Sequence, residues 1–187
     1  MNAKFFGKTT AIAAAAAMMM SMAACSGGSM DDSNSSAGAA SGNTITLGSI
    51  TTNSGTAAAY GEAELMGFKL AISEINAKGG LNGKKIKLDS MDDKGDATEA
   101  SNAFNKLAGD SNVLAVLGPT ISSTTAAVAP LADQSKLPAI APAATSDSIA
   151  TGGYLFRTCF KDSYQGEIAA KFAAETLKVK KVAVLYG

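Results

Sequence analysis

Hydrophobic residues recur along the chain with two different periods. A spacing of two, as from Ile45 to Leu47, is typical of a strand, and spacings of three and four, as from Leu65 to Phe68 and Ile72, are typical of an amphipathic helix. The pattern predicts strands at residues 44–50, 85–89, 113–117 and 137–141, and between them helices at residues 65–75, 96–107 and 121–134.

The order of these elements is βαβαβαβ, which is typical of an α/β fold with a parallel sheet and right-handed crossovers, here a Rossmann-like lobe. Asp96 followed by Glu99 predicts a capping box at the start of the second helix. The unbroken apolar run at 113–117 predicts a strand that is covered on both faces. Pro130 lacks an amide hydrogen, so it should bend the third helix.

A second group of elements follows the first. A strand is expected at Tyr154–Thr158, a helix at Gln165–Lys178 and another strand at Lys181–Tyr186. A strand–helix–strand segment has too few neighbours to bury both faces of its sheet. We therefore expect these residues to begin a second lobe that is incomplete here.

The first 25 residues have the pattern of an export signal. Lys4 and Lys8 give it a positive start, and the apolar stretch Ala11–Met20 is too short to span a bilayer. The small residues before Cys25 resemble a bacterial lipobox, whose cysteine receives a lipid and becomes the new N-terminus. An ordinary signal peptide, or an uncleaved anchor with a chance cysteine, is the alternative. Residues 26–43 contain almost no bulky apolar side chain, so we expect a flexible tether there.

Charge and composition exclude several classes of protein. The chain has 16 basic and 16 acidic residues, so no strong field favours nucleic acid. It has no histidine, which removes Ser-His-Asp and Cys-His catalysis and the commonest zinc ligand. A dinucleotide-binding enzyme would need a G-x-G-x-x-G fingerprint after the first strand, and residues 49–55 lack it. We therefore expect no enzyme, no catalytic residue and no cofactor.

Two further features have structural interpretations. Asp92 and Asp93 are interpreted as a solvated strand end rather than a metal site, because no third ligand type clusters with them, and no metal is expected. Cys159 is interpreted as a small buried residue.

Candidate chemistry lies in three loops that follow strands, at residues 51–61, 118–125 and 142–146. In an open parallel sheet, ligands bind outside the carboxyl ends of the strands, where all three loops should meet. The second loop opens a helix, whose unpaired N–H groups suit a carboxylate, and Ser122 adds a hydroxyl donor. The third loop offers the Ala143 carbonyl and the Thr145 hydroxyl, and Tyr60 can form an apolar wall.

Donors beside acceptors match a zwitterion, with its carboxylate on the second loop and its ammonium on the third. Ser and Thr before helices are also common as plain N-caps, so both interpretations stay open. Asp162 likewise could line the cleft or cap the helix expected at Gln165.

Several short motifs, in their order and spacing, resemble the branched-chain amino-acid-binding proteins, receptors of the type I periplasmic-binding-protein fold. The matching segments are SGTAAAYGE at 54–62, INAKGGLNGKKIKL at 75–88, DDKGD at 92–96, GPTISSTT at 118–125, APAATS at 141–146, YLFRT at 154–158 and DSYQG at 162–166. The resemblance covers nearly all of the chain after the tether.

The resemblance implies a role for each candidate residue. It implies that the Ser122 hydroxyl binds the ligand carboxylate, with the Ser123 backbone beside it. It implies that Ala143 and Thr145 hold the ammonium and carboxylate, and that Tyr60 flanks the ligand. Some relatives have a disulfide between the loop after the second strand and the loop at 118–125; Gly95 and Ile121 stand near those places, so it is absent here.

The resemblance also implies a two-lobed receptor that delivers an amino acid, branched-chain or otherwise aliphatic, to the permease of an ABC importer. We expect a monomer, anchored by lipid on the extracytoplasmic face of the cell membrane, with no nucleic-acid partner. Alternatives are a receptor for an amide or urea, a sensory lipoprotein of the same fold, and a Rossmann-like enzyme. The expected organisation is a signal peptide at 1–24, lipidated Cys25 and tether at 25–43, a ligand-binding lobe at 44–150, and the start of a second lobe at 151–187.

Overall fold

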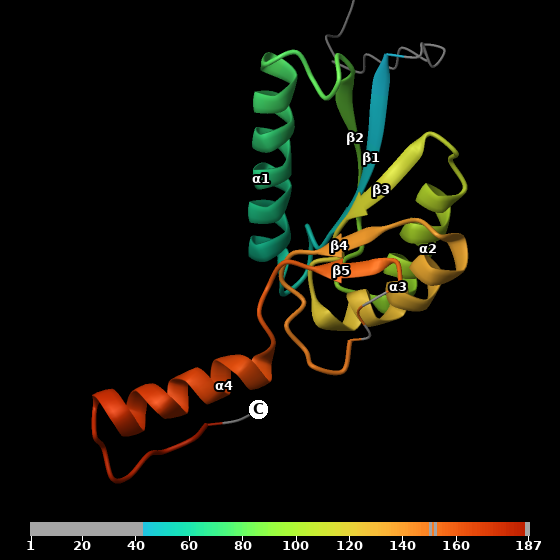
Figure 1. Ribbon diagram of the computed structural model, residues 1–187. Coiled ribbons are helices and arrows are strands. Elements are labelled where there is room, and N and C mark those ends of the chain that lie inside the picture. The colour runs from blue at the N-terminus through green and yellow to red at the C-terminus, as the bar shows by residue number, and fades with distance from the viewer. Residues whose placement is uncertain (1–42, 150, 152, 186–187) are drawn as a thin grey trace, which may run out of the picture. The chain divides into compact units, whose positions relative to one another are not determined.

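A computed structural model describes residues 43–149, 151 and 153–185. Its centre is a five-stranded parallel sheet in the order β2-β1-β3-β4-β5 (Figure 1). The strands are β1 (Thr44–Thr51), β2 (Lys85–Asp92), β3 (Val113–Leu117), β4 (Ala139–Ala141) and β5 (Leu155–Arg157). The predicted α/β class and the parallel sheet are confirmed.

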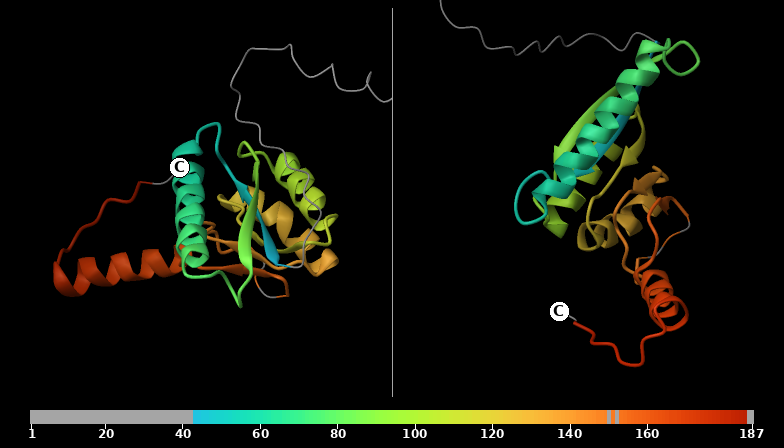
Figure 2. Two further views of the ribbon diagram at one scale, coloured as in Figure 1. Left: turned by 90° about the horizontal axis from the view of Figure 1, so that it is seen from above. Right: turned by 90° about the vertical axis from the view of Figure 1, so that its left-hand side faces the viewer.

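Among the described residues, three helices connect strands and cover the sheet on its two sides, and a fourth follows β5. They are α1 (Ala58–Ala77), α2 (Ala97–Ala108), α3 (Ser122–Ser135) and α4 (Asp162–Lys171), the last continuing into the π-helical turn η1 (Phe172–Thr176). Helix α1 lies on one side of the sheet, and α2 and α3 lie together on the other (Figures 1 and 2). None of the described helices is long and apolar enough to cross a membrane.

The hydrophobic core lies between the sheet and the α2–α3 layer. Its largest fully buried side chains include Phe104 and Leu107 from α2, Val128 from α3, and Ile50 and Val116 from the strands. Burying a side chain of this size contributes about 1.5–3 kcal/mol. This core holds β1, β3 and β4 in place, and with them the loops that follow these strands.

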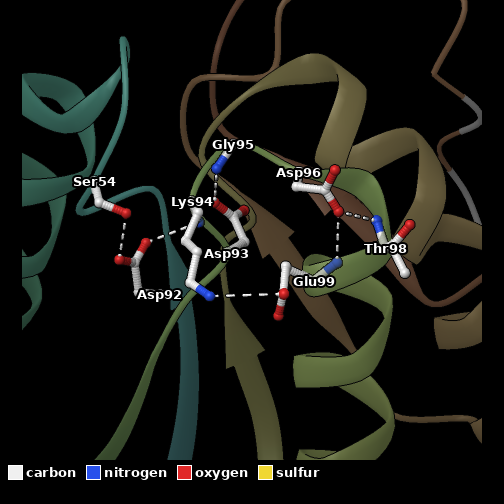
Figure 3. A network of polar contacts seen from close by, with 8 residues as sticks. All are labelled: Ser54, Asp92, Asp93, Lys94, Gly95, Asp96, Thr98 and Glu99. Carbon is white, nitrogen blue, oxygen red and sulfur yellow. Dashed lines mark hydrogen bonds and ion pairs between the residues drawn. The ribbon is translucent and has the colours of Figure 1, made fainter.

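The start of α2 is capped as its sequence predicts, but only in part. The Asp96 carboxylate accepts hydrogen bonds from the amides of Thr98 (2.8 Å) and Glu99 (2.9 Å). The Glu99 side chain is directed to the ammonium of Lys94, 3.6 Å away, so the returning half of the capping box is not formed (Figure 3).

The prediction that β3 is covered on both faces is wrong. Leu114 is 57% exposed, whereas Val113 and Val116 are buried. Helix α1 packs against β1 and β2, and it leaves this face of β3 uncovered among the described residues.

The strand expected to open a second lobe belongs to the first sheet. Strand β5 pairs in parallel with β4, so the boundary expected at residue 151 does not separate this strand from the first sheet. Helix α4 begins at Asp162, three residues before the expected Gln165. The strand predicted at 181–186 is not formed, since residues 181–185 have no regular structure and Leu185 is 99% exposed. A strand needs a neighbour for its backbone hydrogen bonds, and the described chain offers none there.

Candidate functional site

The three candidate loops meet at one edge of the sheet. Because β1, β3 and β4 run in parallel, their carboxyl ends lie on the same side. The loops are also bonded to one another. The amide of Thr52 donates to the Thr120 hydroxyl over 3.1 Å, and the amide of Ser146 donates to the Ser122 hydroxyl over 3.2 Å. The predicted convergence of the loops is therefore present.

The second loop turns sharply between β3 and α3, and its glycine makes this turn possible. Gly118 has φ +111°, in the left-handed region that side chains disfavour, and a Cβ there would collide with the carbonyl of Ile50. The loop therefore passes close against β1 before α3 begins.

Ser122 does not act as the N-cap of α3. It is the first helical residue, the N-cap is Ile121, and no side chain caps this end. The Ser122 oxygen instead accepts the Ser146 amide, which leaves its own hydroxyl hydrogen free to donate to a ligand. Beside it, the amide of Ser123 is one of the first-turn N–H groups that have no partner within a helix. The two donors suit a carboxylate.

The neighbouring threonines serve the helix itself. The hydroxyls of Thr124 and Thr125 donate back to the carbonyl of Ile121 over 3.1 and 2.8 Å, and both residues are buried. They strengthen the start of α3, and their hydroxyl hydrogens are used within the helix.

The third loop presents Ala143 and Thr145, both half-buried. Among the described residues, neither the Ala143 carbonyl nor the Thr145 hydroxyl has a hydrogen-bond partner, so both can serve a ligand. The backbone around them is fixed from two sides. The Thr145 carbonyl accepts the Asp162 amide over 3.0 Å, and the Arg157 guanidinium donates to the carbonyls of Ala144 (3.1 Å) and Ser146 (2.9 Å).

Asp147 caps α4, a role that the sequence analysis had considered for Asp162. The Asp147 carboxylate accepts the hydroxyl (2.7 Å) and the amide (2.9 Å) of Ser163, and these bonds hold the pKa of Asp147 below its usual value. Asp162 is the first residue of the helix and its N-cap is Lys161, so the capping hypothesis for Asp162 is wrong.

Tyr60 lies in the first turn of α1 and is 68% exposed. Helix α1 begins after the carboxyl end of β1. Tyr60 therefore follows a strand at the same edge of the sheet as Ser122, Ser123, Ala143 and Thr145. Gly61 packs directly against the backbone of Thr52, where a Cβ would collide with the Thr52 carbonyl. This close approach fixes the start of α1 against the first loop.

A chain of polar contacts connects α1 with the first and second loops and with the end of β2. The Thr120 hydroxyl donates to the Glu64 carboxylate over 2.7 Å, and the Thr52 hydroxyl donates to the Asp93 carboxylate over 2.6 Å. Burial raises the pKa of Glu64, the Thr120 hydrogen bond lowers it and the nearby Asp93 raises it, with a net increase. One oxygen of Glu64 and one of Asp93 are buried without a hydrogen-bond partner among the described residues.

The interpretation of Asp92 and Asp93 as a solvated strand end is wrong for Asp93. Asp93 is fully buried and also accepts the amide of Gly95 over 2.9 Å (Figure 3). Asp92 accepts the Ser54 hydroxyl over 2.8 Å and the amides of Asn53 and Lys94. Burial raises the pKa of Asp92, but these hydrogen bonds outweigh it and hold the pKa below its usual value. Both aspartates therefore brace the first loop.

Gly95 and Ile121 are neighbours, since a Cβ on Gly95 would lie 3.7 Å from Cδ1 of Ile121. Cys159 is half-buried rather than buried, and it has no disulfide partner among the described residues. No group of three side chains suited to a metal ion occurs within residues 43–149, 151 and 153–185. Cys25 and the expected lipobox lie outside the described residues.

Sequence reasoning did not find the residues that hold the loops in place. Glu64, Thr52, Asp93, Asp147 and Arg157 all act through partners that are distant in sequence, or through backbone carbonyls. Such contacts leave no periodic pattern in the sequence.

Comparisons with known proteins agree on one family. Residues 44–187 match the family described as periplasmic binding protein. The chain is 35% identical to the Leu/Ile/Val-binding protein BraC3 of Rhizobium johnstonii over 143 residues, covering 75% of this chain and 39% of that protein. It is also 35% identical to the Leu/Ile/Val-binding protein of Escherichia coli K12 over 135 residues, covering 71% and 36%. The chain thus spans less than half the length of these relatives.

Solved structures give the same result. The branched-chain amino acid transporter substrate binding protein LivJ of Streptococcus pneumoniae, in complex with isoleucine, is 42% identical with a TM-score of 0.68, covering 72% of this chain and 39% of that one. A solute binding protein of Rhodopseudomonas palustris, in complex with 3,4-dihydroxybenzoic acid, is 28% identical with a TM-score of 0.65, covering 72% and 37%. Relatives of this fold therefore bind carboxylates with and without an amino group.

Proposed function

Because the chain belongs to the periplasmic binding protein family, we propose that it is the first lobe of a receptor that binds a branched-chain or other aliphatic amino acid and passes it to an ABC importer. Its relatives are binding proteins rather than enzymes, and the loops at the sheet edge offer hydroxyls, amides and carbonyls but no acid–base pair. The resemblance to Leu/Ile/Val-binding proteins supports the class of ligand.

One observation carries the proposal: the donor-rich start of α3 adjoins the acceptor-bearing third loop, and the Ser122–Ser146 hydrogen bond joins them. A ligand carboxylate would accept from the Ser122 hydroxyl and the Ser123 amide. Its ammonium would donate to the Ala143 carbonyl, and Thr145 would bond to either group. Tyr60 would flank the aliphatic side chain.

The test separates an amino-acid site from a general carboxylate site. The receptor with both lobes is titrated calorimetrically with leucine, isoleucine and valine, then with 4-methylpentanoate, which is leucine without its amino group, and with 3,4-dihydroxybenzoate. We expect leucine to bind at least about tenfold more tightly than 4-methylpentanoate, because a hydrogen bond from a charged group contributes about 1.5–3 kcal/mol. Equal affinity for the two would contradict the assignment of Ala143 and Thr145 to the ammonium.

We further propose that the mature protein is monomeric and held at the extracytoplasmic membrane surface by a lipid on Cys25. The small residues before Cys25 support the lipid anchor, and stable anchoring by lipid needs more than one acyl chain. Cells are labelled with a fatty-acid analogue, and the wild type is compared with Cys25→Ala and with Cys159→Ala as the matched control. Incorporation should be lost in Cys25→Ala alone, and persistence in that variant would refute the anchor.

A further inference from the structure

Arg157 makes an unusual set of contacts for a residue at the end of a strand. It is the last residue of β5, paired with Ala141 of β4, and its side chain is partly buried. The guanidinium donates to three backbone carbonyls of the loop between these strands, at Ala144 (3.1 Å), Ser146 (2.9 Å) and Ile149 (3.2 Å). No carboxylate forms a salt bridge with it within the described residues. Its hydrogen bonds go to the loop backbone.

These contacts fix the peptide plane that precedes Thr145. A peptide unit is rigid and planar, so the Ala144 carbonyl and the Thr145 amide move together. The bond from Arg157 to the Ala144 carbonyl therefore sets the orientation of this plane. The carbonyl of Ala143, the proposed ammonium acceptor, belongs to the preceding peptide plane, which is joined to this one at the Cα atom of Ala144.

The peptide plane that follows Thr145 is fixed by other residues. The Thr145 carbonyl accepts the Asp162 amide over 3.0 Å, and the Ser146 amide donates to the Ser122 hydroxyl over 3.2 Å. With both flanking planes held, the direction of the Cα–Cβ bond of Thr145 is fixed, and the hydroxyl has only its side-chain rotamers left to adopt. Among the described residues, Arg157 alone donates to the carbonyl of the peptide plane that precedes Thr145.

Arginine is suited to this task by the shape of its side chain. The guanidinium is planar and presents five N–H donors in a fixed fork, so it can bond several carbonyls at once. A lysine at the same place would keep the positive charge but could not reproduce the fork. The comparison of the two residues therefore distinguishes geometry from charge.

We propose that Arg157 is a positioning residue for ligand binding: it holds the loop at 142–149 so that the Ala143 carbonyl and the Thr145 hydroxyl face the ligand, without touching the ligand itself. This inference rests on the proposed function. The ligand contacts proposed for Ala143 and Thr145 would then depend on the side chain of Arg157, which lies on the neighbouring strand β5.

The experiment is a double-mutant cycle in the receptor with both lobes. Leucine affinity is measured by calorimetry for the wild type, Arg157→Met, Thr145→Ala and the double variant, and Arg157→Lys is included as the charge-preserving control. We expect Arg157→Met to weaken binding by about tenfold, the order of one lost hydrogen bond to a charged group. Thr145→Ala should cost less in the Arg157→Met background than in the wild type, because Thr145 is already misplaced there. Arg157→Lys should recover little of the loss.

Additive effects of the two substitutions, or full affinity in Arg157→Lys, would overturn the proposal. Amide hydrogen exchange measured by NMR provides a readout that does not depend on the ligand. In Arg157→Lys, the hydrogen-bonded amides of Ser146 and Ile149 should exchange faster while those of the core strand β3 stay protected, and unchanged exchange in the loop would also overturn the proposal. If the wild type binds no amino acid, the proposed function fails, and the exchange data still decide whether Arg157 positions the loop.

Discussion

Replacing Ser122 by alanine removes a hydroxyl that makes one hydrogen bond within the lobe and that we propose to make a second one to the ligand. The Ser122 oxygen accepts the Ser146 amide over 3.2 Å, and its hydrogen is free to donate to the ligand carboxylate. Loss of a hydrogen bond to a charged group costs about 1.5–3 kcal/mol, which weakens binding roughly 10- to 150-fold. Loss of the bond to Ser146 lowers the free energy of unfolding by about 0.5–1 kcal/mol, because water can replace it at this half-buried position.

The assay measures both quantities on the same samples. Calorimetric titration with leucine gives the affinity, and urea denaturation of the ligand-free protein gives the free energy of unfolding. Ser123→Ala is the matched control, since the Ser123 hydroxyl is exposed and its proposed contact is made by the backbone amide, which alanine keeps. We expect Ser123→Ala to change neither quantity by more than about 0.5 kcal/mol.

Two results would refute this reasoning. If Ser122→Ala binds leucine as tightly as the wild type does, the hydroxyl is not a ligand contact. If Ser122→Ala and Ser123→Ala lose affinity equally, the effect comes from the helix terminus as a whole and not from the oriented hydroxyl.

Three further predictions concern the rest of the lobe. The pKa of Glu64 is raised in the folded state, so the folded protein favours the protonated carboxyl, and the wild type should lose stability relative to Glu64→Gln as the pH rises through that pKa. Parallel urea titrations of the two proteins from pH 4 to 8 measure the difference in their free energies of unfolding. A difference that stays constant with pH would contradict the raised pKa. Phe104→Ala should lower the free energy of unfolding by about 3–5 kcal/mol, while Leu70→Ala on the exposed side of α1 should change it by less than about 0.5 kcal/mol. Residues 26–187 alone should bind leucine far more weakly than the receptor with both lobes, because the loops of one lobe leave the ligand half hydrated. Submicromolar affinity of this segment in a calorimetric titration would show that the site is complete without the second lobe.

The local elements of this lobe could be predicted from sequence because their signals are local. The spacing of Leu65, Phe68 and Ile72 places a helix, and Asp96 at the start of α2 caps it as expected. The position of β5 could not be predicted in this way, because its pairing with β4 depends on which edge of the sheet is free and not on its own residues.

The candidate site was predictable to a similar extent. Loops rich in Ser, Thr and Gly after strands were enough to predict that residues 51–61, 118–125 and 142–146 meet at one edge of the sheet. The burial of Asp93 was not predictable from its neighbours, since its partner Thr52 lies 41 residues away. The part played by Arg157 was hidden for another reason: backbone carbonyls accept hydrogen bonds at every position, so the sequence does not mark which carbonyls an arginine will reach.

The bonds that join the three loops also bear on the thermodynamics of binding. Thr52 is bonded to Thr120, Ser122 to Ser146, and Arg157 to the third loop by hydrogen bonds made entirely between groups of this lobe. An amino acid that binds as proposed meets groups that are already immobilised, so this lobe gives up little conformational entropy on association. The entropic cost of forming the closed complex then falls mainly on the ligand, on the second lobe and on the motion that brings the two lobes together.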